Sequence, residues 1–270
     1  AQRTKRALFA NVQNKFPMKA LPLLVLLFAY ATAAQVKPLA NAHAHNDYEH
    51  ASPLLDALAQ GFTSVEADVH LAGNELYVSH DAPRGLDSAR TLKMLYLNPL
   101  RERVRQNAKR VYPGYDGVFR LMVDFKTNGE ATCATLRRQL RNYPELADNP
   151  FFVVFVSGNR PVATILNDTT IAVDGRPEDL TAFHPASRMP VISENFNKVC
   201  RWNGQGQMPE AEFLKVKTLA DQTHAQGKKL RLWAIPDQPN AWATLLQAGV
   251  DLINTDRLAD LGVFLRKRMD

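Results

Sequence analysis

Residues 64–71 read Ser-Val-Glu-Ala-Asp-Val-His-Leu, a mainly apolar run that is interrupted by two carboxylates, Glu66 and Asp68. Side chains two residues apart on a β-strand point to the same face, so these carboxylates share one face of the predicted strand. The apolar residues of the run are typical of a strand that is buried on both faces, as in a parallel sheet. The stretch therefore predicts a parallel strand that carries an acidic pair.

Similar runs alternate with amphipathic stretches after residue 35. The predicted strands lie at residues 39–45, 64–71, 121–126, 151–157, 170–174, 190–194, 230–235 and 252–255, with a small extra strand at 75–80. The predicted helices lie at residues 53–60, 91–110, 131–141, 160–166, 210–226, 240–247 and 258–268. This alternation predicts an α/β fold, a single-domain (β/α)8 TIM barrel. A doubly wound open sheet is the alternative, but no Gly-rich phosphate loop follows a predicted strand, which also argues against a nucleotide enzyme.

The chain has 270 residues and a formal net charge of +6, from 33 Lys and Arg against 27 Asp and Glu. Its 46% of hydrophobic residues is typical of a globular protein and excludes a disordered or collagen-like chain. Five cations and no acid fall in the first 34 residues, so the rest of the chain is close to neutral. The basic total therefore belongs mainly to the N-terminal segment, and we expect no nucleic-acid partner.

That segment, residues 1–34, is predicted to be an N-terminal extension followed by a secretory signal peptide. Lys19 precedes an almost wholly apolar run at residues 21–31, and small residues at 31–33 resemble a cleavage site. The run is about half of the ~20 residues that span a bilayer, which argues against a stable anchor. We therefore expect an exported protein, periplasmic or secreted, with its TIM-barrel domain at residues 35–270.

Two further features bear on the environment of the protein. Cys133 and Cys200 are too few for a disulfide framework, so we expect two buried free thiols, with a single bridge as the alternative. The arginine-rich stretch 100–110 is predicted to be a solvated outer helix, and the alternative is a transient contact with an anionic membrane surface. We expect a monomer.

Three carboxylates are predicted to meet at one end of the barrel. Asp124 and Lys126 repeat the spacing of Glu66 and Asp68 on the next barrel strand. Carboxylates that converge in a largely apolar barrel mouth repel one another unless a cation neutralises them. Oxygen ligands favour Mg²⁺ or Ca²⁺ over Zn²⁺, so we predict one such ion on Glu66, Asp68 and Asp124. The alternative is a set of salt bridges with Lys126 and a nearby arginine.

Other polar side chains lie beside this acidic group. His45 and His80 fall at predicted strand ends, where one can act as base or nucleophile and the other can protonate a leaving oxygen. Lys126 can stabilise charge on phosphate oxygens, and Asn254 can hydrogen-bond a phosphate or a metal-bound water. Trp233 is predicted to wall the substrate site, with ordinary packing as the alternative.

Taken together, these residues resemble the glycerophosphodiester phosphodiesterase family, within the wider phospholipase C-like phosphodiesterases. The resemblance rests on His45-Asn46-Asp47, on the runs 61–69, 76–81 and 123–126, and on Trp233 with the run 249–256. It implies a TIM barrel, a divalent metal and cleavage of a phosphodiester. It also implies metal binding by Glu66, Asp68 and Asp124, a catalytic pair of His45 and His80, and Lys126 as the partner of the third ligand.

The sequence departs from that family in several places. The family usually has an arginine after the first histidine and a Pro-Glu-Asn triplet soon afterwards, whereas Asn46 follows His45 here and is predicted to contact substrate. Asp124 stands where the family usually has Glu. The Asp-Phe-Lys form and the Trp233 and Asn254 pair are similar to the sphingomyelinase D-like branch. The opening His-Asn-Asp-Tyr is most similar to the branch named after the yeast protein altered inheritance of mitochondria 6.

The sequence thus predicts a metal-dependent phosphoric diester hydrolase. Its expected substrate is a small-molecule or lipid phosphodiester, such as a glycerophosphodiester or a (lyso)phospholipid-like molecule. One alternative is an amidohydrolase or a polymerase-and-histidinol-phosphatase-type metal hydrolase, which would use His43 with His45 and would need further histidines such as His184 or His224. The other alternative is a catalytically inactive barrel that acts as a binding module.

Overall fold

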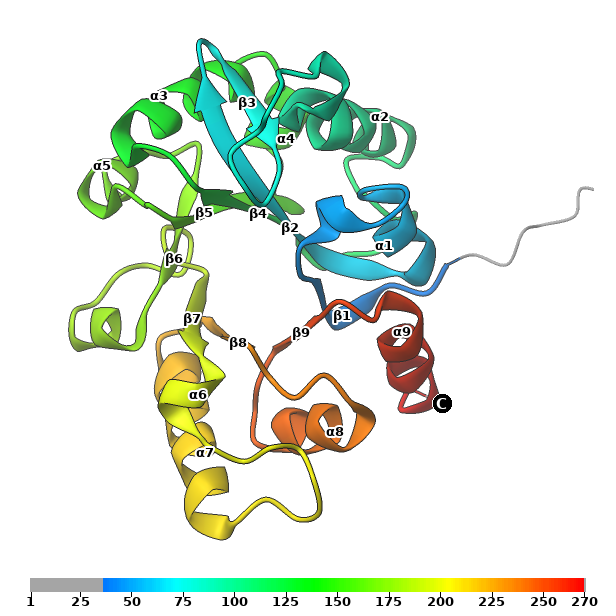
Figure 1. Cartoon of the computed structure of the whole chain (residues 1–270), viewed down its shortest axis with the longest axis vertical. Coiled ribbons are helices and arrows are strands. Elements are labelled where there is room, and N and C mark those ends of the chain that lie inside the picture. Colours follow the sequence, from blue (N-terminus) through cyan, green and yellow to red (C-terminus); the bar gives the residue numbers. More distant parts are fainter. Residues whose placement is uncertain (1–35, 270) are drawn as a thin grey trace, which may run out of the picture. The chain divides into compact units, whose positions relative to one another are not determined.

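The computed structural model describes residues 36–269, and the predicted signal peptide and N-terminal extension lie outside this range (Figure 1). Eight parallel strands pair in the order β1-β2-β4-β5-β6-β7-β8-β9, and β9 pairs with β1 to close a barrel. Their bounds are β1 Leu39–Ala44, β2 Phe62–Ala72, β4 Phe119–Phe125, β5 Phe152–Gly158, β6 Ala172–Gly175, β7 Val191–Asn195, β8 Lys229–Trp233 and β9 Leu252–Thr255. The predicted TIM barrel is confirmed, and its closure excludes the open sheet.

A short hairpin extends one barrel strand beyond the mouth. β3 (Glu75–Val78) pairs antiparallel with the far end of β2, with Val78 opposite Val69. The Ser79 amide donates to the Asp68 carbonyl at 3.2 Å, so the chain continues back along β2 after the hairpin. The hairpin therefore returns the residues that follow β3 to the carboxyl end of the barrel.

Helices surround the barrel on the outside (Figure 1). They are α1 Leu55–Gln60, α2 Asn98–Gln106, α3 Gly129–Leu140, α4 Pro144–Ala147, α5 Val162–Leu166, α6 Phe196–Val199, α7 Glu210–Ala225, α8 Pro239–Gln247 and α9 Leu258–Lys267. The short helices α4 and α6 were not predicted, because four residues are too few to show a helical period. After β6 there is a 3₁₀ turn, Pro177–Thr181, in place of a full α-helix.

The helix predicted at residues 91–110 is present over residues 92–106, but it is not α-helical throughout and it ends earlier. Lys93–Leu97 form a π-helical turn that runs directly into α2. Pro99 lies in the first turn of α2, and a proline has no N–H to continue the hydrogen bonds of a preceding α-helix. At the other end, Ala108 and Lys109 have positive φ, which stops the helix.

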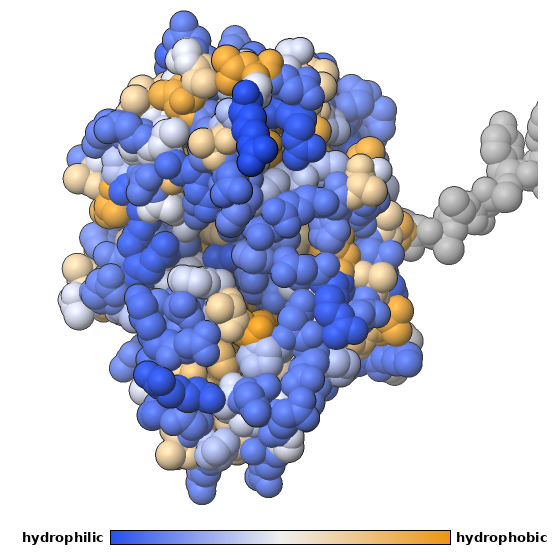
Figure 2. Space-filling model, in the orientation of Figure 1, coloured by the Kyte–Doolittle hydropathy of each residue, from blue (hydrophilic) through white to orange (hydrophobic). Residues whose placement is uncertain are grey.

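The surface and the cysteines agree with a globular domain. Cys133 and Cys200 are both buried and free, as expected. Within residues 36–269, the structure contains no helix that is long and apolar enough to span a membrane. Figure 2 shows a face dominated by hydrophilic side chains, with apolar residues in small separate groups. Arginines of the cationic stretch have partners, since Arg105 pairs with Glu145 and Arg110 pairs with Asp116.

A close approach between two loops at the mouth of the barrel generates a stability prediction. Gly129 begins α3, and a Cβ atom there would lie 2.0 Å from the backbone oxygen of Asn159. We expect Gly129→Ala to lower the free energy of unfolding by about 1 to 3 kcal/mol, because backbone atoms must move to relieve the overlap. Gly85→Ala is the control, since a Cβ there meets nothing within 4 Å. Urea unfolding measures both, and equal stability of the two variants would contradict the packing.

Candidate active site

A cavity of about 480 Å³ lies at the carboxyl end of the barrel. Seven of the nine predicted site residues line it: His45, Asn46, Glu66, His80, Asp124, Lys126 and Trp233. They come from the ends of β1, β2, β4 and β8 and from the segment after β3. Of the other two predicted residues, Asp68 lies in the wall beneath the cavity, and Asn254 is buried against Arg231. The sequence prediction of a single polar mouth therefore corresponds to one cavity.

The three carboxylates predicted as metal ligands lie together. One oxygen from each of Glu66, Asp68 and Asp124 lies within 4.8 Å of the others. The parallel register of β2 and β4 places Asp68 directly beside Asp124, and Glu66 is two residues earlier on the same face. Glu66 and Asp68 are 5% and 1% exposed, so their charges are shielded from bulk water.

A protein cation holds one oxygen of each carboxylate. The Lys126 ammonium nitrogen lies 2.9 Å from Asp68 Oδ2 and 2.9 Å from Asp124 Oδ1. Arg231 Nη2 donates to Glu66 Oε2 at 2.8 Å. Burial raises the pKa of Asp124 although the charge of Lys126 opposes this, because Glu66 and Asp68 add like-charge repulsion.

The remaining oxygens fit a cation. Asp68 Oδ1 is buried and has no hydrogen-bond partner in the described part of the chain, although buried polar atoms are normally paired. Three carboxylates with two cationic side chains, Lys126 and Arg231, leave one net negative charge. A hard divalent ion with oxygen ligands would supply the missing partner and turn the net charge positive. The residues present therefore fit the predicted Mg²⁺ or Ca²⁺.

His45 is oriented by a carboxylate from the last barrel strand. Its Nδ1 lies 2.8 Å from Asp256 Oδ1. Because a carboxylate only accepts, Nδ1 carries the proton, and the neutral ring has its lone pair on Nε2. Burial lowers the pKa of His45, but the Asp256 hydrogen bond and the charge of Glu66 outweigh burial, so the pKa is raised overall.

His80 belongs to a network centred on a buried tyrosine. Tyr48 donates its hydroxyl proton to Asp68 Oδ2 at 2.7 Å, and the same hydroxyl oxygen is 3.3 Å from His80 Nδ1. His80 Nδ1 is also 3.3 Å from Asp68 Oδ2. The His80 side chain is 58% exposed, whereas Asp68 is almost fully buried. Tyr48 thus connects a buried acid to a histidine that reaches the solvent.

Asn46 lies beside this network in a left-handed backbone conformation, with φ 43° and ψ 40°. Asparagine tolerates this conformation better than most residues, which suits it to a tight turn after β1. Its Oδ1 lies 2.8 Å from the hydroxyl oxygen of Tyr48. Asn46 therefore lines the cavity and also supports the turn that positions Tyr48.

Behind that turn, Asp47 is fully buried and holds the loop between β1 and α1. Its Oδ2 accepts hydrogen bonds from the Leu54 amide at 2.6 Å and from the Tyr96 hydroxyl at 2.8 Å, while Oδ1 has no partner within the described range. Burial raises the pKa of Asp47 to about 6, against the lowering effect of these hydrogen bonds.

Asn254 lies beneath the cavity wall. It is 5% exposed, and its Oδ1 accepts hydrogen bonds from Arg231 Nε at 2.9 Å and Nη2 at 2.6 Å. Its Oδ1 is therefore held by Arg231, and Asn254 is not among the residues that line the cavity, so its contact with a phosphate stays a prediction.

The sequence prediction missed two residues that support Glu66. Arg231 binds it directly, and its position two residues before Trp233 on β8 is the signal that could have found it, since both share one face. His43 Nε2 lies 3.3 Å from Glu66 Oε2, and its Nδ1 accepts from Ser64 Oγ at 2.7 Å. Burial lowers the pKa of His43 well below its usual value, and the charge of Arg231 adds to this, so the ring is neutral.

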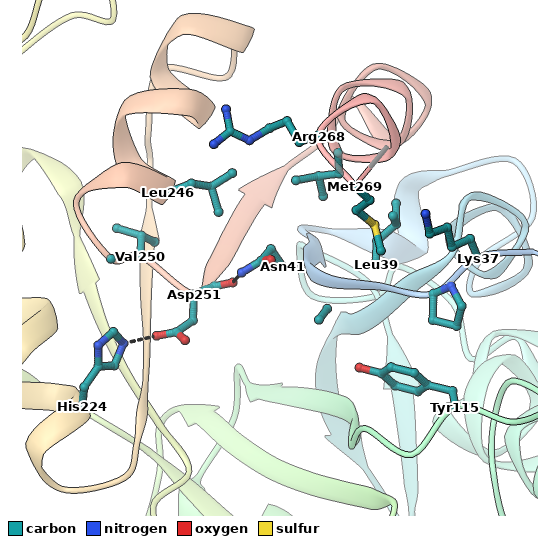
Figure 3. A pocket seen from close by; sticks show the side chains of 14 residues that line it. Lys37, Leu39, Asn41, Tyr115, His224, Leu246, Val250, Asp251, Arg268 and Met269 are labelled. Carbon is teal, nitrogen blue, oxygen red and sulfur yellow. Dashed lines mark hydrogen bonds and ion pairs between the residues drawn. The ribbon is translucent and has the colours of Figure 1, made fainter.

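A larger cavity, of about 690 Å³, lies at the opposite end of the barrel (Figure 3). Its lining includes the first residues of β1 and the segment before β9, and it contains none of the predicted site residues. His224 points into it and bonds Asp251 Oδ2 at 2.7 Å. Reaction sites of TIM barrels lie at the carboxyl ends of the strands, so this cavity is at the wrong end. His224 therefore does not supply the further histidine that the amidohydrolase alternative requires.

Comparison with known proteins identifies the family. Residues 31–170, just over half of the chain, match the AIM6-like phosphodiesterase domain. The chain belongs to this family. Residues 229–259 of this AIM6-like protein also match the glycerophosphoryl diester phosphodiesterase family, and this segment includes Arg231, Trp233 and Asn254. The resemblance to glycerophosphodiester phosphodiesterases and to the branch named after altered inheritance of mitochondria 6 is confirmed, whereas these matches do not show the sphingomyelinase D-like features.

Relatives of the AIM6-like chain include altered inheritance of mitochondria protein 6 of Eremothecium gossypii, 28% identical over 85% of this chain and 70% of that protein. A homologue of that protein from Arthroderma benhamiae is 27% identical over 79% of this chain and 80% of its own length. A crystal structure of a glycerophosphodiester phosphodiesterase from Parabacteroides distasonis superposes with a TM-score of 0.57 at 15% identity. It covers 87% of this chain and all of that one. This structural likeness shows a shared fold.

The buried carboxyl of Asp47 generates a prediction about pH. Because its pKa is raised on folding, the folded state binds a proton more readily, and this group lowers stability as the pH rises from about 4 to about 6. We expect Asp47→Asn to remove this dependence. The unfolding free energy of the variant relative to wild type should then be up to about 3 kcal/mol higher at pH 7 than near pH 4. Denaturant titrations at several pH values measure it.

Asp148→Asn is the matched control, because Asp148 is exposed at the end of α4. A difference between Asp47→Asn and wild type that stays constant between pH 4 and pH 7 would contradict a buried, raised-pKa carboxyl at Asp47.

Proposed function

We propose that this AIM6-like protein is a metal-dependent phosphodiesterase. One observation carries the proposal: Glu66, Asp68 and Asp124 converge in a cavity lined by two histidines, each with one oxygen held by a protein cation, and Asp68 Oδ1 is buried without a hydrogen-bond partner in the described structure. A divalent ion bound there would supply positive charge that stabilises the negative charge developing on the phosphate. The family relationship supports this class of reaction.

His45 acts on the attacking side of the phosphate, as general base or as nucleophile. Asp256 holds the Nδ1 proton, so the neutral ring offers Nε2 as the free basic nitrogen. This nitrogen either takes a proton from the attacking hydroxyl, whether water or a neighbouring hydroxyl of the substrate, or attacks phosphorus itself. Both roles require His45 to be neutral.

His80 is the residue that protonates the leaving oxygen. Asp68 and Tyr48 lie against its Nδ1, and its exposed ring edge leaves Nε2 available to donate. Lys126 stays protonated between Asp68 and Asp124, because their charges outweigh the effect of burial and raise its pKa. Its position in the cavity lining allows it to donate to a nonbridging phosphate oxygen.

The substrate is a phosphodiester with a small alcohol head group, a glycerophosphodiester or a (lyso)phospholipid-like molecule. The cavity of about 480 Å³ is within the range that holds small-molecule ligands. Trp233, 37% exposed at the end of β8, forms an apolar part of its wall. Asn46 is positioned to contact the substrate from the turn after β1.

A phosphodiester panel with and without EDTA tests the proposal. We expect His45→Ala to lower kcat by at least about 100-fold, because a general base or nucleophile is lost. EDTA should abolish activity, and Mg²⁺ or Ca²⁺ should restore it. His224→Ala is the matched control, a histidine that also binds a carboxylate but lies at the other end of the barrel. Full activity of His45→Ala, or full activity in EDTA, would show that the proposed mechanism is wrong.

The contact between Asp256 and His45 generates a prediction about the pH profile. Asp256 raises the pKa of His45, so its removal should lower that pKa, and the neutral ring should persist to lower pH. We expect Asp256→Asn to move the acidic limb of kcat/KM to lower pH by about one unit. Asp260→Asn is the control, because Asp260 is exposed and pairs with Arg257. An unmoved or upward-shifted limb would refute the assignment of that limb to His45.

A further inference from the structure

A second charged cluster lies in the barrel wall on β6, which β5 separates from the strand of Asp124. Asp174 on β6 is fully buried. Its carboxylate accepts hydrogen bonds from Ser157 Oγ at 2.9 Å, Ser193 Oγ at 2.6 Å and Arg176 Nη1 at 2.7 Å. The three donors come from β5, β7 and the end of β6, so Asp174 is satisfied without any contact with the acidic triad.

Arg176 extends from this cluster into the cavity. It lines the same space as His45, Glu66 and Lys126, and its side chain is 21% exposed. Nη1 also donates to the Gly175 carbonyl at 2.9 Å, and Nη2 lies 3.3 Å from Ser157 Oγ. Its Nε has no partner among residues 36–269. A guanidinium has five N–H donors, so part of this one is unused at the cavity wall.

The other two cations of the cavity are used differently. Lys126 bridges Asp68 and Asp124, and Arg231 is buried against Glu66 and Asn254. Their acidic partners are the carboxylates of the reaction site itself. The partner of Arg176 lies behind it, in the interior of the barrel. Burial lowers the pKa of Arg176, but the charge and hydrogen bond of Asp174 and the more distant charges of Glu194 and Asp124 together raise it, so the guanidinium keeps its charge.

We propose that Arg176 binds an anionic oxygen of the substrate and that Asp174 is the positioning residue that aims it. The inference rests on the proposed function, because it adds a contact to the same cavity. A guanidinium fixed on one edge by a carboxylate loses little further freedom when its other edge binds an anion, and such charge-assisted bonds are strong.

Two parts of the substrate could supply that oxygen. One is the reacting phosphodiester, whose nonbridging oxygens carry its charge. The other is a carboxylate or a second phosphate on the head group. Neighbouring strands are about 4.8 Å apart, so β6 lies about 10 Å from the strand of Asp124, with β5 between them (Figure 1). An arginine side chain can span part of that distance, and the matched substrates below distinguish the two sources.

Glycerophosphoserine and glycerophosphoethanolamine form the matched pair, since they differ by one carboxylate. Their dissociation constants are measured by calorimetry in Mg²⁺ on protein that carries His45→Ala to prevent turnover, with and without Arg176→Gln. We expect Arg176→Gln to weaken binding about tenfold to a hundredfold. Equal weakening of both diesters assigns the contact to the phosphate, and weakening of the serine diester alone assigns it to the head group.

Three further variants separate binding from folding. Arg176→Lys keeps the charge and should lose only part of the affinity, and Asp174→Asn should weaken binding less than Arg176→Gln. Arg141→Gln is the control, because Arg141 is exposed at the end of α3. Unchanged dissociation constants in Arg176→Gln, with or without a lower Tm, would overturn the inference and leave Arg176 and Asp174 as a structural ion pair.

Turnover of the same two diesters is measured separately on the protein with His45 intact. If neither is cleaved while Arg176→Gln still weakens their binding, the proposed function fails and the anion contact stands. If both are cleaved and Arg176→Gln changes neither KM nor the dissociation constants, the anion contact fails and the proposed function stands.

Discussion

The chemistry at the barrel mouth depends on one lysine held between two carboxylates. Lys126 Nζ is 2.9 Å from both Asp68 Oδ2 and Asp124 Oδ1. The register of β2 with β4 places these two acids side by side, where their repulsion in a poorly solvated wall would be large without a cation. Lys126 relieves the repulsion and occupies one oxygen of each acid. The second oxygen of Asp68 is buried without a partner in the described part of the chain, and this makes the wall suitable for a metal ion.

Glu66 is held in the same way, by a different cation. Arg231 and His43 both contact Oε2, so the orientation of this carboxylate is fixed from below. A buried ion pair of this kind adds little net stability compared with apolar packing, because both charges are desolvated. The position of this ion pair at the base of a cavity is better explained by the proposed reaction. A rigid carboxylate can hold a metal ion, and a fixed positive charge attracts an anionic substrate.

Local pattern was enough to predict the barrel and most of the cavity lining. The spacing of Glu66 and Asp68, repeated at Asp124, needs only the two-residue period of a strand. The contact of Arg231 with Glu66 joins residues 165 positions apart, and it exists only because the barrel closes. No local pattern encodes that closure geometry. The contact of Asn254 with Arg231 was not predicted either. It depends on the register between β8 and β9 and on the side-chain directions inside the barrel.

Asn46 stands where the resembled family usually has a positive charge, and a different strand of the barrel can supply that charge. The family that the sequence resembles usually has an arginine after the first histidine, but here Asn46 lines the cavity and lies against the Tyr48 hydroxyl, which in turn contacts Asp68 and His80. A cation at position 46 would disturb that network. The ends of several strands line one cavity, so a positive charge can be supplied from the opposite wall. Arg176, held from behind by Asp174, is placed to do this without competing for the three carboxylates of the metal site.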